Sequence, residues 1–332
     1  MRGLVTVFGG SGFIGSHAVR ALAKAGWRIR VAVRRPWQAY RLRLLGDVGQ
    51  IEIVQANVRV AETAERALDG AEAVVLSVGT PFEYGAQTFQ AVRADGSRTV
   101  AEAAAARGIT NFAFVSGIGA SPEAASRAGR AVAEAESAVR GAVPSVTILR
   151  PSVVFGPDDR FFNQLAGMAV ASPVMPVFCP ATRLQPVYVA DVARAIAATL
   201  HDRATDGRTF ELGGPGVYTM REIVEITLAE IQRPRPILAL PDALAGAIGL
   251  GGDVLAFLHG PLPMLLKPPI TTDQIAMLKS DNVVSPGAAG LADLGIAAEP
   301  LEAIIPTYLY RYRPGGQFAE LAPPEPIRGT AS

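Results

Sequence analysis

VTVFGGSGFIG, residues 5–15, is the stretch from which the fold of this chain is deduced. The apolar run over 4–8 predicts a strand, and the glycines that follow it lead directly into a helical pattern over 12–25. A strand, a glycine-rich turn and a helix in this order form the first unit of a sheet that binds nucleotides at its edge. A purely structural turn is the alternative interpretation.

Each glycine of this stretch has a separate task. Gly9 permits a tight turn, Gly12 lets the backbone approach a pyrophosphate, and Gly15 lets the helix pack on the strand. The anion would lie at the N-terminus of the helix. The residues of the turn that we expect to contact a cofactor are Gly9, Ser11, Gly12, Phe13, Ile14 and Gly15.

The chain around this stretch continues to alternate apolar runs with helical patterns, which is typical of a parallel doubly wound sheet. Strands are expected over 4–8, 29–33, 51–54, 73–78, 112–116 and 146–149. Helices are expected over 12–25, 63–68, 89–107 and 123–140. The predicted fold is therefore α/β, a Rossmann-type doubly wound parallel sheet with a smaller mixed C-terminal lobe.

The pattern loosens after Arg150. Expected elements are helices over 161–170 and 189–200, strands over 185–188 and 209–212, and two helices within 271–313. Thr219 and Glu222 have the spacing of a capping box. We predict a nucleotide-binding domain over 1–150, a mixed part over 151–313 from which some elements return to the first sheet, and a proline-rich tail over 314–332.

The second expected strand ends at Val33, where a carboxylate would normally accept the ribose hydroxyls of NAD. This chain has Arg34 and Arg35 instead. Guanidinium groups attract a 2′-phosphate and stack on adenine, so the pair favours NADP(H), with two solvated arginines as the alternative. Further cofactor contacts are expected at Asn57 and Val58 after the third strand and at Gly79 and Thr80 after the fourth.

Composition limits the function to one that depends on a local site. The 332 residues carry 31 Lys and Arg against 30 Asp and Glu, and this net charge of +1 provides no field to hold nucleic acid. Charged residues are 18% and mean hydropathy is +0.27, which suggests a covered apolar face. The single cysteine, Cys179, excludes an internal disulfide and a cysteine-based metal site.

The longest apolar stretch runs over 237–266. It contains Asp242, Asp253, several glycines and several prolines, so we expect no transmembrane helix in it. It lies on a membrane or a partner, or it folds back on its own lobe.

Four segments together resemble the short-chain dehydrogenase/reductase superfamily, in its extended and atypical branches. They are the glycine turn, Val115-Ser116, LRPSVVFGP over 149–157 and PVYVADVA over 186–193. The resemblance implies cofactor contacts at Ser116, Pro151 and Val154. The family's chemistry uses a serine and then a tyrosine with a lysine four residues later, the tyrosine exchanging a proton with the substrate.

Ser116 stands at the serine position, but the positions of the tyrosine and lysine hold Ala128 and Val132. A shifted alignment does not restore the pair, because no tyrosine occurs between 84 and 188 and no lysine between 24 and 267. The resemblance therefore implies a protein that is not an enzyme. Tyr84, Tyr188 and Arg130 are the substitutes that remain open.

Other titratable residues predict no site. His17, His201 and His259 lie in unrelated segments. Asp158 and Asp159 are expected to form a solvated helix start, and Asp191 is expected to be a charge at a helix N-terminus.

Segments 271–284, 291–296 and 305–313 resemble the nucleotide-binding accessory subunit of respiratory complex I, in its alphaproteobacterial version. The resemblance implies tightly bound NADPH without turnover, other complex I subunits near the quinone end as partners, and a peripheral place on the cytoplasmic side of a bacterial inner membrane. The alternatives are a soluble NADPH-dependent reductase or epimerase and an NADP(H)-sensing regulatory protein.

Overall fold

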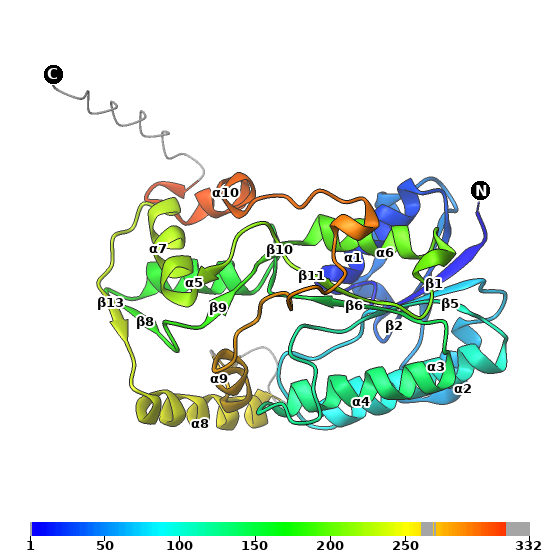
Figure 1. The fold of residues 1–332 in the computed structure, drawn as a ribbon, viewed down its shortest axis with the longest axis horizontal. Helices are drawn as coiled ribbons and strands as arrows, with labels where there is room; N and C mark the ends of the chain where they lie inside the picture. Colours follow the sequence, from blue (N-terminus) through cyan, green and yellow to red (C-terminus); the bar gives the residue numbers. More distant parts are fainter. Residues whose placement is uncertain (1, 260–267, 269, 317–332) are drawn as a thin grey trace, which may run out of the picture.

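The computed structural model describes residues 2–259, 268 and 270–316. Its centre is a sheet of seven parallel strands in the order β11-β6-β5-β4-β1-β2-β3 (Figure 1). These strands are β1 (Leu4–Phe8), β2 (Arg28–Val33), β3 (Ile51–Gln55), β4 (Ala73–Leu76), β5 (Asn111–Val115), β6 (Thr147–Pro151) and β11 (Thr209–Leu212). The predicted α/β fold is confirmed. The strand order changes direction between β1 and β4, and open sheets of this kind bind ligands at such a point.

Helices cover both faces of the sheet (Figure 1). Val5 and Val7 point into a core shared with α1 (Phe13–Lys24) and α6 (Val189–Thr199). Phe8, on the opposite face, packs in the core formed with α2 (Ala61–Ala67), α3 (Asp95–Ala106) and α4 (Arg127–Ala142). Both faces are therefore buried, which explains why the strands are continuously apolar.

Two helix starts differ from the prediction. The helix expected over 123–140 begins at Arg127, because the Ser126 hydroxyl accepts a hydrogen bond from the Gly129 amide at 3.0 Å and caps it there. The helix expected over 89–107 opens with a π-turn over Gln90–Ala94 before α3.

The C-terminal part has a core of its own, in which Phe162, Ile223 and Leu309 are completely buried. Its helices are α5 (Phe161–Ala171), α7 (Met220–Glu230), α10 (Leu301–Ile304) and α11 (Pro306–Leu309). The short strands are β7 (Val154–Phe155), β8 (Met175–Val177), β9 (Arg183–Leu184), β10 (Val187–Tyr188), β12 (Tyr218–Thr219) and β13 (Ile237–Ala239). Three 3-10 turns also lie after β6, over Arg203–Thr205, Ala292–Leu294 and Tyr310–Tyr312, and two lie between β2 and β3, over Pro36–Gln38 and Tyr40–Leu45. The capping box of Thr219 and Glu222 is confirmed at the start of α7.

Helix α8 (Asp242–His259) lies beside α9 (Thr272–Leu278) along one edge of the molecule (Figure 1). We expected no transmembrane helix over 237–266, and residues 242–259 of this stretch form one continuous helix. Within the described residues α8 alone is long and apolar enough to cross a membrane, with 18 residues and a mean hydropathy of 1.2. Its glycines do not interrupt it, because Gly249 and Gly252 face the segment that leads into α9 and allow close packing there.

Two buried aspartates hold the C-terminal segment in place, and one of them, Asp191, lies in the first turn of α6 as expected. Asp159 is only 4% exposed and accepts hydrogen bonds from the Tyr308 hydroxyl at 2.7 Å and the Gly156 amide at 3.0 Å. Asp191 is fully buried and accepts from Arg194 at 2.6 Å and from the Glu299 amide at 2.8 Å. The prediction of a solvated helix start at Asp159 was therefore wrong.

Replacing Tyr308 by phenylalanine should destabilise the protein by about 1.5–3 kcal/mol, because it removes a donor from a buried carboxylate. Chemical denaturation measures the difference. The matched control is Tyr310→Phe, which changes an exposed tyrosine of the same segment and should have little effect.

The effect of Tyr308→Phe should depend on pH. Burial raises the pKa of Asp159, and the Tyr308 hydrogen bond acts against that rise. A carboxyl with a raised pKa in the folded state adds stability below its unfolded pKa and loses this contribution as pH rises through the folded pKa. The loss in Tyr308→Phe should therefore grow as pH rises through the folded pKa of Asp159, because the ionised carboxylate depends more on the Tyr308 donor than the neutral carboxyl does. An equal loss below and above that pKa would contradict this account.

Candidate nucleotide-binding site

The turn after β1 has the geometry that its glycines were expected to allow. Gly9 has φ of +81°, and a Cβ there would lie 2.3 Å from the Ser77 carbonyl oxygen. A Cβ on Gly15 would lie 2.2 Å from the Gly9 carbonyl oxygen. Both positions therefore require glycine, the first for its backbone conformation and the second for the close contact of helix and turn.

The N-terminus of α1 is left open by its own sequence. No side chain caps it, and its first turn holds no acidic residue. The amides of this turn and the positive end of the helix dipole are therefore available to an anion. A dinucleotide pyrophosphate fits this set of donors.

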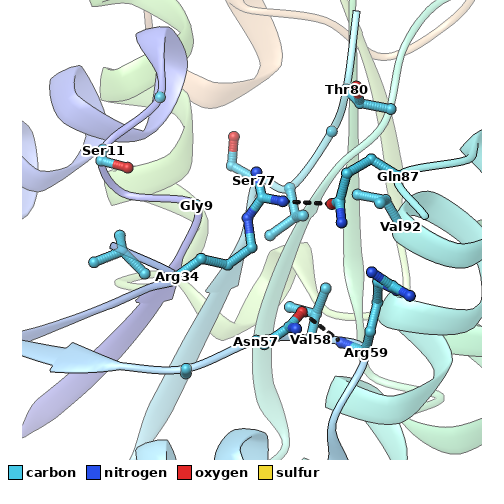
Figure 2. Close-up of a pocket in the computed structure, with 15 residues that line it drawn as sticks. Gly9, Ser11, Arg34, Asn57, Val58, Arg59, Ser77, Thr80, Gln87 and Val92 are labelled. Atoms are coloured by element: carbon cyan, nitrogen blue, oxygen red, sulfur yellow. Dashed lines mark hydrogen bonds between the residues drawn. The ribbon is translucent and has the colours of Figure 1, made fainter. Parts of the chain in front are cut away.

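A cavity of about 220 Å³ lies at the carboxyl ends of β1 to β4, beside this turn. Figure 2 shows Arg34, Asn57, Ser77 and Gln87 around it. Of the residues that we predicted from sequence, it brings together Gly9, Ser11, Gly12, Arg34, Asn57, Val58, Gly79 and Thr80. The residues that sequence reasoning missed are Val33, Ala56, Arg59, Ser77, Val78, Gln87 and Val92.

Other predicted residues lie outside this cavity. Phe13, Ile14 and Gly15 form the first turn of α1, and Arg35 is exposed. Ser116 follows β5, Pro151 ends β6, and Val154 begins β7 in a separate two-stranded sheet. None of the three lines this cavity.

Arg34 and Gln87 meet across the cavity. The Arg34 guanidinium donates a hydrogen bond to the Gln87 side-chain oxygen (Figure 2). Gln87 belongs to a short loop closed by an antiparallel bridge between Tyr84 and Gln87. Sequence reasoning could find only cavity residues that directly follow a strand. Gln87 reaches the cavity through the path of this loop, so it could not be found in that way.

The cavity is suited to an anion. Arg34 and Arg59 line it, and no aspartate or glutamate does so among the described residues. Arg34 forms no ion pair with any residue of the described part of the chain. Asn57 is held by its own turn, where its side-chain oxygen accepts from the Arg59 amide at 3.2 Å. The phosphates of a nicotinamide dinucleotide match this charge.

The serine at the family's catalytic position is bound by its neighbours. The Ser116 hydroxyl donates to Glu136, which is 4% exposed. Glu136 also accepts two hydrogen bonds from Arg150, at 2.8 and 2.6 Å. This contact raises the pKa of Arg150. Ser116 is therefore part of a buried ion-pair network.

The three substitutes for the missing tyrosine and lysine have contacts elsewhere, and the ring of Tyr84 meets the ring of His259 edge-on. Arg130 donates to the Ala124 and Ala125 carbonyl oxygens at 2.6 and 3.1 Å, at the start of its own helix. The ring of Tyr188 packs on Phe155 in the C-terminal core. Among the described residues no group of His, Cys, Asp and Glu could hold a metal ion.

The fold and the cavity define a Rossmann-type NAD(P)H-binding protein, and a family model with the description NAD(P)H-binding matches residues 9–203. Over 323 residues the chain is 34% identical to NADH dehydrogenase (ubiquinone) 1 alpha subcomplex subunit 9, mitochondrial, of Arabidopsis thaliana, covering 94% of this chain and 79% of that protein. The chain therefore belongs to the NAD(P)H-binding family, and within it to the group of proteins similar to this subunit 9.

Two further comparisons show similarity to proteins whose names describe enzymes. A ceramide reductase of Caulobacter vibrioides is 36% identical over 198 residues, which cover 59% of this chain and 61% of that protein. The Escherichia coli quinone oxidoreductase QOR2 in complex with NADPH superimposes with a TM-score of 0.70 at 20% identity, covering 90% of this chain and 97% of that one. This second likeness concerns the fold alone.

Proposed function

We propose that this protein is a non-catalytic accessory subunit of respiratory complex I that carries NADPH as a permanent structural element. The proposal depends on two features taken together. The nucleotide cavity is lined by cationic side chains, and the family's tyrosine and lysine are absent while its serine, Ser116, is bound by Glu136. The subunit 9 relative supports the assignment to complex I.

NADPH is preferred over NADH in this proposal because of the residues at the end of β2. Arg34 stands at the edge of the cavity where a carboxylate would bind the ribose hydroxyls of NAD. Arg59 adds a second guanidinium on the neighbouring loop. The bound nucleotide would hold the glycine turn, the Asn57 loop and the Gln87 loop together, and so stabilise the fold.

The place that we propose is the junction of the hydrophilic and membrane arms near the quinone end, peripheral to the inner membrane on the cytoplasmic side in a bacterium. Helix α8 supports a peripheral contact. Its Leu250, Val254 and Phe257 are 62%, 60% and 77% exposed. Apolar side chains gathered on one exposed helix favour a membrane surface or a partner protein as their cover.

Purification of the full chain from its native membranes in mild detergent tests the assignment to complex I. We expect it in a multi-subunit NADH:quinone oxidoreductase particle at about one copy per complex, with NADPH extracted in equal amount. A soluble monomer or homodimer would favour a reductase. Copurification with a soluble partner protein, in less than one copy per copy of this chain, would favour a regulatory protein.

A second candidate is a soluble NADPH-dependent reductase, and the specific observation in its favour is the similarity to a ceramide reductase. An enzyme of that kind needs a proton donor beside the nicotinamide. Ser116 is the residue at the corresponding family position, and its hydroxyl already donates to Glu136.

Turnover separates the two candidates. Purified protein with NADPH and a panel of ketones, aldehydes and quinones should show no multiple turnover in NADPH absorbance, because general acid–base catalysis contributes about 10²- to 10⁴-fold and its groups are missing. Ser116→Ala should leave the absorbance trace unchanged. Ordinary enzyme rates that this substitution abolishes would establish the reductase instead.

A further inference from the structure

A second cavity, in the C-terminal part of the molecule, is larger than the nucleotide cavity. It has a volume of about 450 Å³ and shares no lining residue with the nucleotide cavity in the described part of the chain. Its walls come from α5, α7, α8 and α9, through Leu165, Met220, Ile248 and Met277 among others. The volume is in the range of small-molecule sites, which is about 300–1,000 Å³.

The walls of this cavity are suited to a hydrocarbon. Most of the residues that line it are aliphatic, aromatic or methionine, and no charged side chain does so among the described residues. Three of the six methionines of the chain, Met168, Met220 and Met277, lie in these walls. Methionine side chains adapt to ligands of irregular shape, and an apolar cavity of such walls holds hydrocarbon in preference to water.

Among the described residues, three polar side chains line the cavity, and they belong to Gln164, Gln274 and Asn282. The Asn282 side chain accepts from the Ser152 hydroxyl at 2.7 Å and donates to the Ile118 carbonyl oxygen at 3.1 Å. An asparagine amide has two N–H donors and two acceptor lone pairs, so one of each remains beyond these two bonds. Asn282 is fixed in position and still has hydrogen-bonding capacity for a neutral polar group.

Helix α8 contributes to the wall of this cavity. Ile248 lies in the cavity wall, while Leu250, two residues further along, is exposed. The same helix thus has apolar side chains on the cavity and on the outer surface.

We propose that this cavity binds a neutral single-chain amphiphile, with its hydrocarbon chain along the methionine-lined walls and its polar end at Asn282. The absence of charged lining residues among the described part of the chain disfavours a charged head group, because burial of an unpaired charge is costly. This proposal does not depend on membership of complex I, since it concerns the chain by itself.

The test uses the purified full chain and the fluorescent methyl ester of cis-parinaric acid. We expect saturable enhancement of fluorescence at one ester per chain, and at least tenfold weaker binding of the free acid at neutral pH. Native mass spectrometry checks the stoichiometry. A wild-type protein that shows no saturable binding would overturn the proposal, and equal affinity for ester and acid would overturn the neutral polar end.

Matched variants locate the site. Ile248→Trp fills the cavity and should weaken ester binding at least tenfold, whereas Leu250→Trp places the same side chain on the outer surface of α8 and should leave binding unchanged. Met168→Trp, from the opposite wall, should repeat the effect of Ile248→Trp. Nucleotide affinity and melting temperature report that each variant is folded. Unchanged ester binding in the folded Ile248→Trp and Met168→Trp proteins would place the ligand elsewhere and refute the proposal.

Discussion

Replacing Arg34 by alanine should weaken NADPH binding by about tenfold to a hundredfold, because a charge-assisted hydrogen bond contributes about 1.5–3 kcal/mol and 1.4 kcal/mol is tenfold in affinity. NADH has no 2′-phosphate, so its affinity should change much less. Isothermal titration of both nucleotides against wild type and variant measures the two differences.

Arg35→Ala is the matched control for this experiment. Both arginines are exposed, but Arg35, which adjoins Arg34 in the sequence, does not line the cavity. It should therefore retain most of the affinity for NADPH. Equal affinity of the wild type for NADH and NADPH would defeat the proposed specificity, and equal losses in both variants would show that the arginines act only through general attraction.

Placing glutamate at Leu250 and Phe257 should transfer the protein from the membrane fraction to the soluble fraction. Burial of one large apolar side chain contributes about 1.5–3 kcal/mol, so two such losses weaken attachment by about 10²- to 10⁴-fold. Both side chains are exposed on α8, which predicts a folded variant. Sedimentation of native membranes after a low-salt wash, followed by immunodetection, measures the distribution.

The control for this variant is the pair Val60→Glu and Val217→Glu, which places the same charges on exposed apolar residues outside α8. It should remain with the membranes, and the nucleotide affinity of both proteins should equal that of the wild type. A Leu250→Glu/Phe257→Glu protein that stays in assembled complex I would show that α8 is not the docking surface.

Removal of the whole chain from Thr271 onward would be a less specific experiment. Asp273 accepts a hydrogen bond from the Arg127 amide at 2.5 Å and so caps α4, and Tyr308 and Leu309 belong to the C-terminal core. Truncation would therefore remove packing from the interior as well as any docking surface. Substitutions on α8 avoid this problem.

Local pattern was sufficient for the first half of the chain. The alternation of apolar runs and helical stretches predicted β1 to β6 with small errors at their ends, and the glycine spacing predicted the turn at Gly9 and the uncapped start of α1. The capping box at Thr219 was found in the same way. These features depend on residues within a few positions of one another, so the order of residues contains the information that forms them.

The errors come from residues whose partners are far away in the chain. Asp159 reads as a surface residue until Tyr308 is brought to it, and Gln87 gives no sign of its place across the cavity from Arg34. No helix was predicted over 242–259, because the segment that packs against the glycines of α8 could not be known from sequence.

The sequence by itself determined the class of fold, the edge of the sheet at which a nucleotide would bind and the absence of the family's tyrosine and lysine, since each follows from residue identity and short-range spacing. Only the tertiary structure decided that Arg34 rather than Arg35 lines the cavity, that Ser116 is held by Glu136, and that α5, α7, α8 and α9 together form a second, apolar cavity. Side-chain burial and hydrogen-bond partners depend on which distant segments meet, and the packing of the whole chain sets that arrangement.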